Sequence, residues 1–215
     1  MTCCDVNGLN RVFSGFPVRF EQLLFRWRGP AGHARSFASA LPDVKGSKVL
    51  DIGGGLGGLG HALLDLGASR VQLVELSQEY LQGARRLAML TGRSERFEFM
   101  HADAARSPAI EGADVVVLDR AVCCYPEAAE LLARAASLSR RTLAFTMPRD
   151  TASVRLFVNL VNGVTRLLRH PYRVFMHDPE LLQRAATSSG HRQVERRRIA
   201  TWELRVFERP SLIQP

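Results

Sequence analysis

A glycine-rich stretch follows the first strongly apolar run of the sequence, and it is the clearest candidate for a binding loop. Asp51 precedes Gly53 by two residues, and Gly55 and Gly57 extend the pattern to Asp-x-Gly-x-Gly-x-Gly. Glycine permits backbone torsion angles that other residues avoid, and it lets backbone N–H groups approach a ligand where a side chain would block them. Continued to Gly60, the same stretch also has the Gly-x-Gly-x-x-Gly spacing of dinucleotide sites. The loop therefore predicts a nucleotide-like ligand and leaves its type open.

An acidic residue, Glu75, ends the next apolar run of the chain. A carboxylate accepts hydrogen bonds from two neighbouring hydroxyl groups, so an acid here can select a ribose without any contact to phosphate. The glycine stretch contains no lysine, whereas the phosphate loop of triphosphate-binding proteins needs Gly-Lys-Ser or Gly-Lys-Thr. The alternative interpretation is that Glu75 is a solvated strand end.

Short β-branched or apolar runs alternate with helical patterns from Lys48 onward, which is typical of a parallel sheet covered by helices. The predicted strands are 48–52, 70–76, 96–102, 113–119, 141–147, 191–200 and 202–209. Three helices have clear start signals, with Ser77 as an N-cap, Pro126 at a first helical position, and Asp178 followed by a proline. We therefore expect one α/β domain with a doubly wound, seven-stranded, mostly parallel sheet and a terminal antiparallel strand pair.

The order of these motifs resembles that of the class I S-adenosylmethionine-dependent methyltransferases. The resemblance spans roughly residues 48–209 and rests on the acid at the end of the first strand, the glycine loop, the acid of the second strand and the terminal antiparallel pair. A dinucleotide-binding fold would have parallel strands throughout. The resemblance implies a Rossmann-like methyltransferase fold with S-adenosyl-L-methionine as cofactor and S-adenosyl-L-homocysteine as its product.

The resemblance also implies which residues bind the cofactor. Glu75 would bind the ribose hydroxyls, and Asp103, after the third strand, would meet the adenine amine. An ordinary turn is the alternative for Asp103. The full implied set is Asp51, Gly53, Gly55, Gly57, Glu75, Leu76, Asp103, Ala104 and Asp119.

The loop after the fourth strand, DRAVCCYP, is more narrowly similar to that of the magnesium-protoporphyrin O-methyltransferases and related bacterial proteins. That family often has His-Tyr-Pro where this chain has Cys-Tyr-Pro at 124–126. The similarity implies an apolar methyl acceptor with a carboxylate, bound under a helical cap at 149–177. It also implies that residues 1–45 form a helical extension over the active site of a methyltransferase domain at 46–215.

Residues of this loop and of the cap could hold and activate the acceptor. Arginine can clamp a carboxylate through two parallel hydrogen bonds. The candidates for contacting the acceptor are Arg120, Cys124, Tyr125, Arg149 and Arg173. A carboxylate needs no general base, because it is already ionised at about pH 7. A hydroxyl acceptor does need one, and Tyr125 and His177 are the candidates, although either could be structural. Asp119 ends the fourth strand and completes the predicted catalytic set.

The cap contains an apolar helix over residues 153–168. Its apolar side chains lie on one broad face, which comprises Val154, Phe157, Val158, Val161, Val164 and Leu168. Such a face most often covers the core of a protein. Lining a lipophilic pocket and touching a bilayer surface are the alternatives.

Adjacent cysteines occur twice, as Cys3-Cys4 and as Cys123-Cys124. If the N-terminal extension lies over the loop, four thiols would meet, which suggests zinc or a soft metalloid acceptor. Adjacent cysteines chelate awkwardly, and no Cys-x-x-Cys occurs. The alternative is that the second pair packs as small apolar residues and the first is a loose tail. We therefore predict no metal site.

Length and composition fit a single domain with a full core, since the chain has 215 residues and 46% hydrophobic content. A net charge of +8 would suit an anionic partner, but the basic residues are spread along the chain. Methyltransferases of adenine amino groups typically have Asn or Asp, two prolines and an aromatic residue after the fourth strand, and this pattern is missing. We therefore expect a small-molecule acceptor rather than a nucleic acid.

The sequence contains no long uncharged apolar stretch and no secretory signal, so we expect a cytoplasmic protein without a membrane span. Peripheral membrane contact and the oligomeric state stay open. The predicted function is S-adenosylmethionine-dependent methylation of a small, largely apolar molecule at a carboxylate or hydroxyl oxygen. The alternatives are methylation of sulfur or a metalloid through the cysteines, methylation of RNA, and cofactor binding without turnover.

Overall fold

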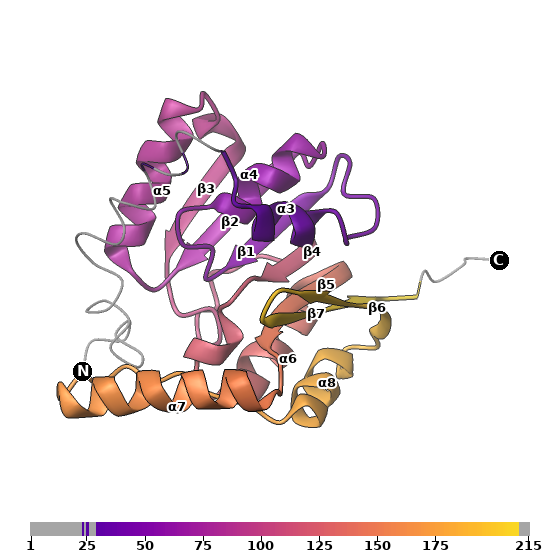
Figure 1. The fold of residues 1–215 in the computed structure, drawn as a ribbon. Helices are drawn as coiled ribbons and strands as arrows, with labels where there is room; N and C mark the ends of the chain where they lie inside the picture. Colours follow the sequence, from indigo (N-terminus) through magenta and orange to yellow (C-terminus); the bar gives the residue numbers. More distant parts are fainter. Residues whose placement is uncertain (1–22, 24, 26–28, 211–215) are drawn as a thin grey trace.

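The computed structural model describes residues 23, 25 and 29–210, and in it a seven-stranded sheet lies between two layers of helices (Figure 1). The strands are β1 (Lys48–Ile52), β2 (Arg70–Glu75), β3 (Phe97–His101), β4 (Ala113–Leu118), β5 (Ser139–Pro148), β6 (Arg192–Ile199) and β7 (Trp202–Glu208). Their order in the sheet is β3-β2-β1-β4-β5-β7-β6. Strands β1 to β5 are parallel, and β7 pairs antiparallel with both β5 and β6. The predicted fold class is confirmed.

The helices divide between the two faces of the sheet. One face is covered by α3 (Gly32–Ala38), α4 (Gly58–Asp65) and α5 (Gln78–Leu90), and the other by α6 (Ala128–Leu138) and α8 (Pro179–Thr187). Strand β4 shows why both faces are needed. Its Val115 and Val117 belong to the core under α4, while Val116 and Leu118 belong to the core under α6. An unbroken apolar run is stable only where helices exclude water from both faces of the strand.

Two of the three predicted helix starts are confirmed. The Ser77 hydroxyl accepts a hydrogen bond from the backbone N–H of Tyr80 at 3.3 Å, and the Asp178 carboxylate accepts one from that of Glu180 at 2.9 Å. The start at Pro126 is wrong, because α6 begins two residues later, at Ala128. The backbone before that proline is extended, as is usual for a residue that precedes proline.

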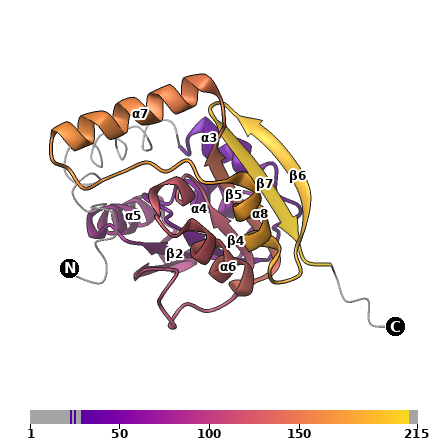
Figure 2. The same cartoon turned by 90° about the horizontal axis from the view of Figure 1, so that it is seen from below.

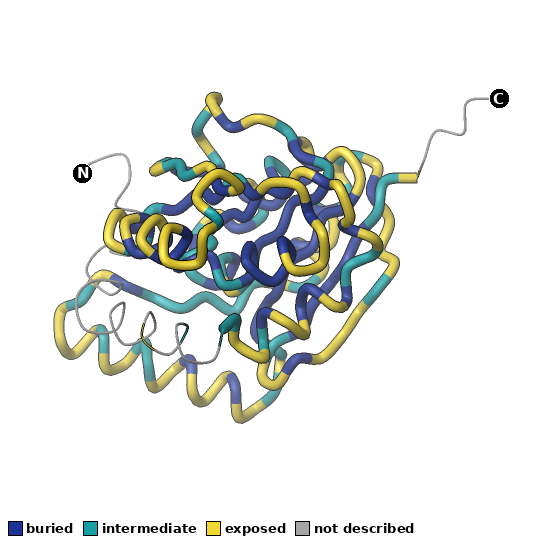
Figure 3. The backbone as a smooth tube through the Cα atoms, turned by 90° about the horizontal axis from the view of Figure 1, so that it is seen from above, coloured by how far each residue is buried: buried dark blue, intermediate teal, exposed yellow. Residues whose placement is uncertain are grey.

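Helix α7 (Ala152–Leu167) stands apart from both helical layers (Figures 1 and 2). Its N-cap is Thr151, and Asn162 binds the returning chain through hydrogen bonds of 2.8 and 2.9 Å to the backbone of Val174. Within α7 only Val154 and Val158 are buried, and Figure 3 shows the helix as largely exposed.

The expectation that the broad apolar face of α7 mainly covers the core is therefore wrong. Three of its predicted members, Phe157, Val164 and Leu168, are exposed to 64%, 47% and 71%. The physical reason is that α7 is tied to the segment that follows it and not to the sheet, so a hollow remains beneath it.

Two glycine-to-alanine substitutions distinguish the effect of close packing on stability from the effect of helix propensity. A Cβ at Gly60 would lie 2.9 Å from the Phe97 ring and 3.1 Å from Val71, whereas a Cβ at Gly163 would meet nothing within 4 Å. We expect Gly60→Ala to lower the free energy of unfolding by about 1–3 kcal/mol through overpacking, and Gly163→Ala to raise it by about 0.5–1 kcal/mol. Urea unfolding measures both, and equal effects of the two variants would contradict the close packing of α4 on the sheet.

Candidate active site

A cavity of about 1200 Å³ opens at the carboxyl ends of β1 and β4, where the strand order reverses. Doubly wound sheets bind ligands at this position, because the connections from the two strands leave on opposite faces and their loops part. The glycine loop and the end of β2 line one side of the cavity. The inner face of α7 and the chain that follows it line the other.

The glycine loop has the backbone geometry that its sequence predicts. Gly53 and Gly55 both line the cavity and have φ angles of +68° and +56°. A Cβ at Gly53 would also lie 2.7 Å from the Cβ of Ala121. Gly57, in contrast, does not line the cavity and forms the N-cap of α4. The backbone of the loop therefore forms part of the cavity wall, with no side chains at Gly53 and Gly55.

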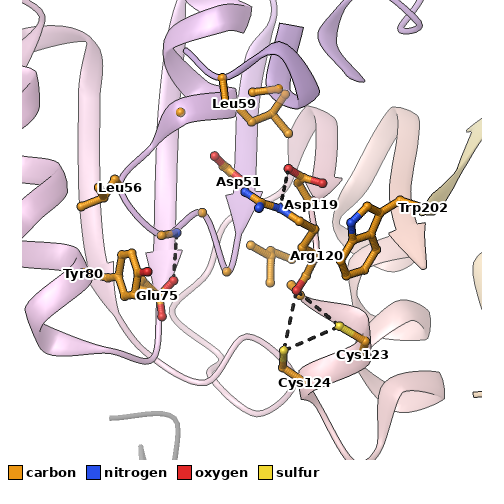
Figure 4. Close-up of a pocket in the computed structure, with 18 of the residues that line it drawn as sticks. Asp51, Leu56, Leu59, Glu75, Tyr80, Asp119, Arg120, Cys123, Cys124 and Trp202 are labelled. Carbon is orange, nitrogen blue, oxygen red and sulfur yellow. Dashed lines mark hydrogen bonds and ion pairs between the residues drawn. The ribbon is translucent and has the colours of Figure 1, made fainter. Parts of the chain in front are cut away.

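The Asp51 side chain is fully buried and lines the cavity at the end of β1 (Figure 4). Neither of its carboxylate oxygens has a hydrogen-bond partner among the described residues. Burial, followed by the nearby charges of Asp119 and Glu75, raises the pKa of Asp51 to about 8. A buried carboxylate without a partner is costly, and a positively charged ligand group would relieve that cost.

Glu75 is held in place by the loops on both sides of it. Its Oε2 accepts a hydrogen bond from the backbone N–H of Gly55 at 3.0 Å, and its Oε1 accepts one from that of Ser77 at 2.8 Å. Burial raises the pKa of Glu75 although these hydrogen bonds oppose it. Each oxygen keeps a lone pair for a further donor. The ring of Tyr80 lies beside Glu75 in Figure 4 and forms a flat wall of the cavity.

Asp119 lies at the end of β4 with several partners. Its Oδ1 is 2.8 Å from Nε2 of His33 and accepts a hydrogen bond from the Thr146 hydroxyl at 2.9 Å, while its Oδ2 is 3.5 Å from Nε of Arg120. Burial alone would raise the pKa of Asp119, but these partners hold it below its ordinary value. The cavity thus contains one well-paired and one unpaired aspartate.

The thiols of Cys123 and Cys124 both line the cavity and lie 3.7 Å apart (Figure 4). The Cys124 thiol is also 3.3 Å from the Tyr172 hydroxyl. The hydrogen bond between the two thiols lowers the pKa of Cys124 and raises that of Cys123. The described part of the chain contains no group of three or more potential metal ligands, and Cys3-Cys4 lie outside it.

The two predicted general bases are both engaged elsewhere. The Tyr125 hydroxyl donates to both carboxylate oxygens of Asp103 at 3.0 Å, and burial together with that charge raises the pKa of Tyr125 above its ordinary value. Nε2 of His177 is 3.0 Å from the Tyr125 carbonyl oxygen, and burial lowers the pKa of His177. Neither His177 nor Asp103 lines the cavity. In this structure the three residues are hydrogen-bonded to other groups of the chain, although Tyr125 lines the cavity, and their predicted roles stay predictions.

The two predicted arginine clamps lie away from the cavity. The Arg149 side chain donates to the carbonyl oxygen of Ala200 at 3.2 Å, and that of Arg173 donates to that of His170 at 2.6 Å. Carbonyl oxygens hold both guanidinium groups and neither residue lines the cavity, so their role as clamps stays a prediction. Arg120, which was also predicted, does line the cavity.

Sequence reasoning missed several residues that line or support this cavity. They are His33, Arg35, Tyr80, Tyr172 and Trp202. Tyr80 had a detectable signal, because it follows Glu75 and the Ser77 cap closely in the sequence. The others come from distant elements and belong to no motif.

The comparison with protein families decides between the ligand types that the glycine loop leaves open. Residues 49–142, a little under half of the chain, match a family described as "Methyltransferase domain". This part of the chain is therefore similar to methyltransferase domains. The match contains the glycine loop, Glu75 and Asp119, and it confirms the expected family. No curated protein matches the chain.

Solved structures share the fold of this methyltransferase domain. An O-methyltransferase family 2 protein from Planctomyces limnophilus, in complex with apigenin, has a TM-score of 0.68 at 22% identity, over 90% of this chain and 61% of that one. Magnesium protoporphyrin IX methyltransferase from Synechocystis, with bound S-adenosylmethionine, has a TM-score of 0.66 at 16% identity, over 94% and 95%. Mitomycin 7-O-methyltransferase has 0.68 at 20%, over 93% and 60%. The chain thus spans less than two thirds of the first and third proteins and nearly all of the second.

S-adenosylmethionine is bound in the similar Synechocystis structure, and the residues around the glycine loop of this chain fit it. Glu75 offers two fixed oxygens to hydroxyl donors, and the unpaired Asp51 carboxylate suits an ammonium group. When bound, the cofactor supplies an electrophilic methyl group. The individual contacts stay predictions.

Replacing Asp51 by asparagine should flatten the pH dependence of stability of the ligand-free protein. The pKa of about 8 in the folded protein lies above the ordinary value of 3.8, so between these pH values the folded protein holds a proton that the unfolded chain lacks. The free energy of unfolding is therefore highest below about pH 4 and falls by about 1 kcal/mol per pH unit up to about pH 8 through this group. Urea unfolding across that range tests this, and an identical slope in Asp51→Asn would contradict it.

Proposed function

We propose that this methyltransferase domain transfers the methyl group of S-adenosylmethionine to a carboxylate oxygen of a small, largely apolar molecule, with a hydroxyl oxygen as the second choice. The observation that carries the proposal is the position of Arg120 at the junction of the polar and apolar ends of the cavity. Figure 4 shows its side chain extending toward Asp51 and Asp119.

An apolar acceptor is supported by the side chains on the cap side of the cavity. That part of the lining comprises Pro148, Phe157, Val158, Val161, Val174 and Trp202. The similar structures also point to small molecules, since their names include magnesium protoporphyrin IX and mitomycin, and one is in complex with apigenin. A cavity of this kind fits a molecule of drug size or larger.

A carboxylate fits the described side chains better than a hydroxyl does. Tyr125 and His177 are already bonded elsewhere, so neither offers a general base to the cavity. A carboxylate needs only alignment with the methyl group, because it is ionised at about neutral pH.

Arg120 is placed to provide that alignment. Its backbone has a φ of +55°, which is unusual for a residue with a side chain, and its N–H donates to the Thr146 hydroxyl at 2.7 Å. The guanidinium lies 3.5 Å from Asp119 and the side chain is half exposed. It can therefore bind an entering carboxylate through two parallel hydrogen bonds.

The cofactor assignment is tested by calorimetry with S-adenosylhomocysteine and, in parallel, NAD. We expect binding of S-adenosylhomocysteine alone. Glu75→Ala should weaken it by about 1–3 kcal/mol through loss of charged hydrogen bonds. Glu98→Ala removes an acid that pairs with Arg70 on the exposed sheet edge, and it should bind like the wild type. Binding of NAD alone, or an unchanged dissociation constant in Glu75→Ala, would overturn the assignment.

The acceptor class is tested with S-adenosylmethionine labelled in its methyl group and pools of apolar carboxylic acids and of their alcohol analogues. A methyl ester releases labelled methanol in mild alkali, whereas a methyl ether keeps its label. We expect an alkali-labile product, and about a 10- to 100-fold loss of kcat/KM in Arg120→Gln but not in Arg184→Gln on α8. An alkali-stable product would contradict carboxylate esterification. Tight S-adenosylhomocysteine binding without any product would favour a binding protein without turnover.

Methylation at sulfur or at a thiol-bound metalloid is a second candidate, favoured by the two thiols 3.7 Å apart in the cavity wall. The cysteine pair would then be required for turnover. Cys123→Ser/Cys124→Ser should keep ester formation if the first candidate is correct. Loss of all transfer in this variant, with S-adenosylhomocysteine binding intact, would favour the second.

A further inference from the structure

The outer face of α7 presents a row of leucines to solvent. Leu156, Leu160 and Leu167 are exposed to 71%, 63% and 82%. Their spacing of four and seven residues places them on one side of the helix. The opposite side contains Val154 and Val158, which are buried and line the cavity. Both sides of α7 are therefore apolar, and a contiguous exposed apolar patch of this kind marks an interaction surface.

Charge identifies the kind of partner. Residues 151–177 contain no Asp or Glu, and they include four arginines. Arg166 and Arg169 are exposed beside the end of the leucine row, whereas Arg155, near its beginning, is paired with Asp150. A helix with an apolar face and only cationic charges suits an anionic bilayer surface.

We infer that the outer face of α7 docks onto an anionic lipid bilayer. The described part of the chain has no helix with the length and hydropathy to cross a bilayer, so the contact would be peripheral. The leucine row would enter the acyl boundary while the arginines stay at the headgroups. This inference concerns the outer face of the helix and does not depend on which acceptor atom is methylated.

The position of the cavity favours a bilayer over other partners. Phe157 is 64% exposed and also lines the cavity, so the docked face and the cavity share one edge. An apolar acceptor dissolved in the bilayer could then enter beneath the helix without crossing water. A second copy of the chain on the same face would instead set arginine against arginine, because residues 151–177 contain no acid and the neighbouring Asp150 is already paired with Arg155.

The test is sedimentation of the full chain with vesicles of phosphatidylcholine, with or without phosphatidylglycerol. We expect binding only with phosphatidylglycerol, weakening as salt is added. Leu156→Gln/Leu160→Gln/Leu167→Gln, and separately Arg166→Gln/Arg169→Gln, should each lose about tenfold or more in partitioning. Met89→Gln/Leu90→Gln on α5 removes two apolar side chains of similar exposure, 62% and 64%, and should bind like the wild type.

Three outcomes would overturn the inference. The first is binding that is absent, or equal for neutral and anionic vesicles. The second is a leucine variant that turns a dimer into a monomer in analytical ultracentrifugation, which would assign the face to a second copy. The third is a leucine variant that is clearly less stable to urea, which would mean that other residues of this chain cover the face. S-adenosylhomocysteine binding is measured on every variant, so failure of docking stays distinct from failure of the proposed function.

Discussion

The parallel pairing of β1 with β2 on one side and with β4 on the other is the constraint on which the rest of the structure depends. Because the chain leaves β1 toward one face of the sheet and β4 toward the other, the loops after these two strands part and a hollow remains between them. The same pairing brings the ends of the three strands to one edge. Asp51, Glu75 and Asp119 meet there although they are far apart in the sequence, and the site follows from the topology before any ligand is considered.

Three acids around one largely apolar hollow repel one another, and the protein treats each differently. Asp119 has His33, Thr146 and Arg120 as partners, and its pKa is low. Glu75 is held by backbone N–H groups, while Asp51 has no partner among the described residues and its pKa is high. A buried acid without a partner lowers the stability of the ligand-free protein at neutral pH, because it must take up a proton or stay charged without compensation. The site therefore lowers the stability of the ligand-free protein while favouring ligand binding, as functional sites often do.

Helix α7 explains why an apolar segment of the sequence is not part of the core. Hydrogen bonds between Asn162 and Val174 tie the helix to the returning chain, so its inner face borders a cavity and its outer face meets solvent. Both faces need apolar side chains, for different reasons. The hydrophobic pattern of a sequence shows that one face of a helix is apolar, but it does not show what packs against that face.

The sequence by itself determined the elements and the polar end of the site, because these depend on local chemistry. Alternating strand and helix patterns, the caps at Ser77 and Asp178, the positive φ of Gly53 and Gly55, and the acid at Glu75 are all set by residues that lie close together in the chain. Only the tertiary structure decided which distant side chains meet, as in the pairs His33–Asp119, Tyr172–Cys124 and Tyr125–Asp103. It also decided that Arg120 lines the cavity, whereas Arg149 and Arg173 do not. The three pairs join residues that lie 86, 48 and 22 positions apart. No spacing in the sequence encodes them, because side-chain direction at such distances is fixed by packing.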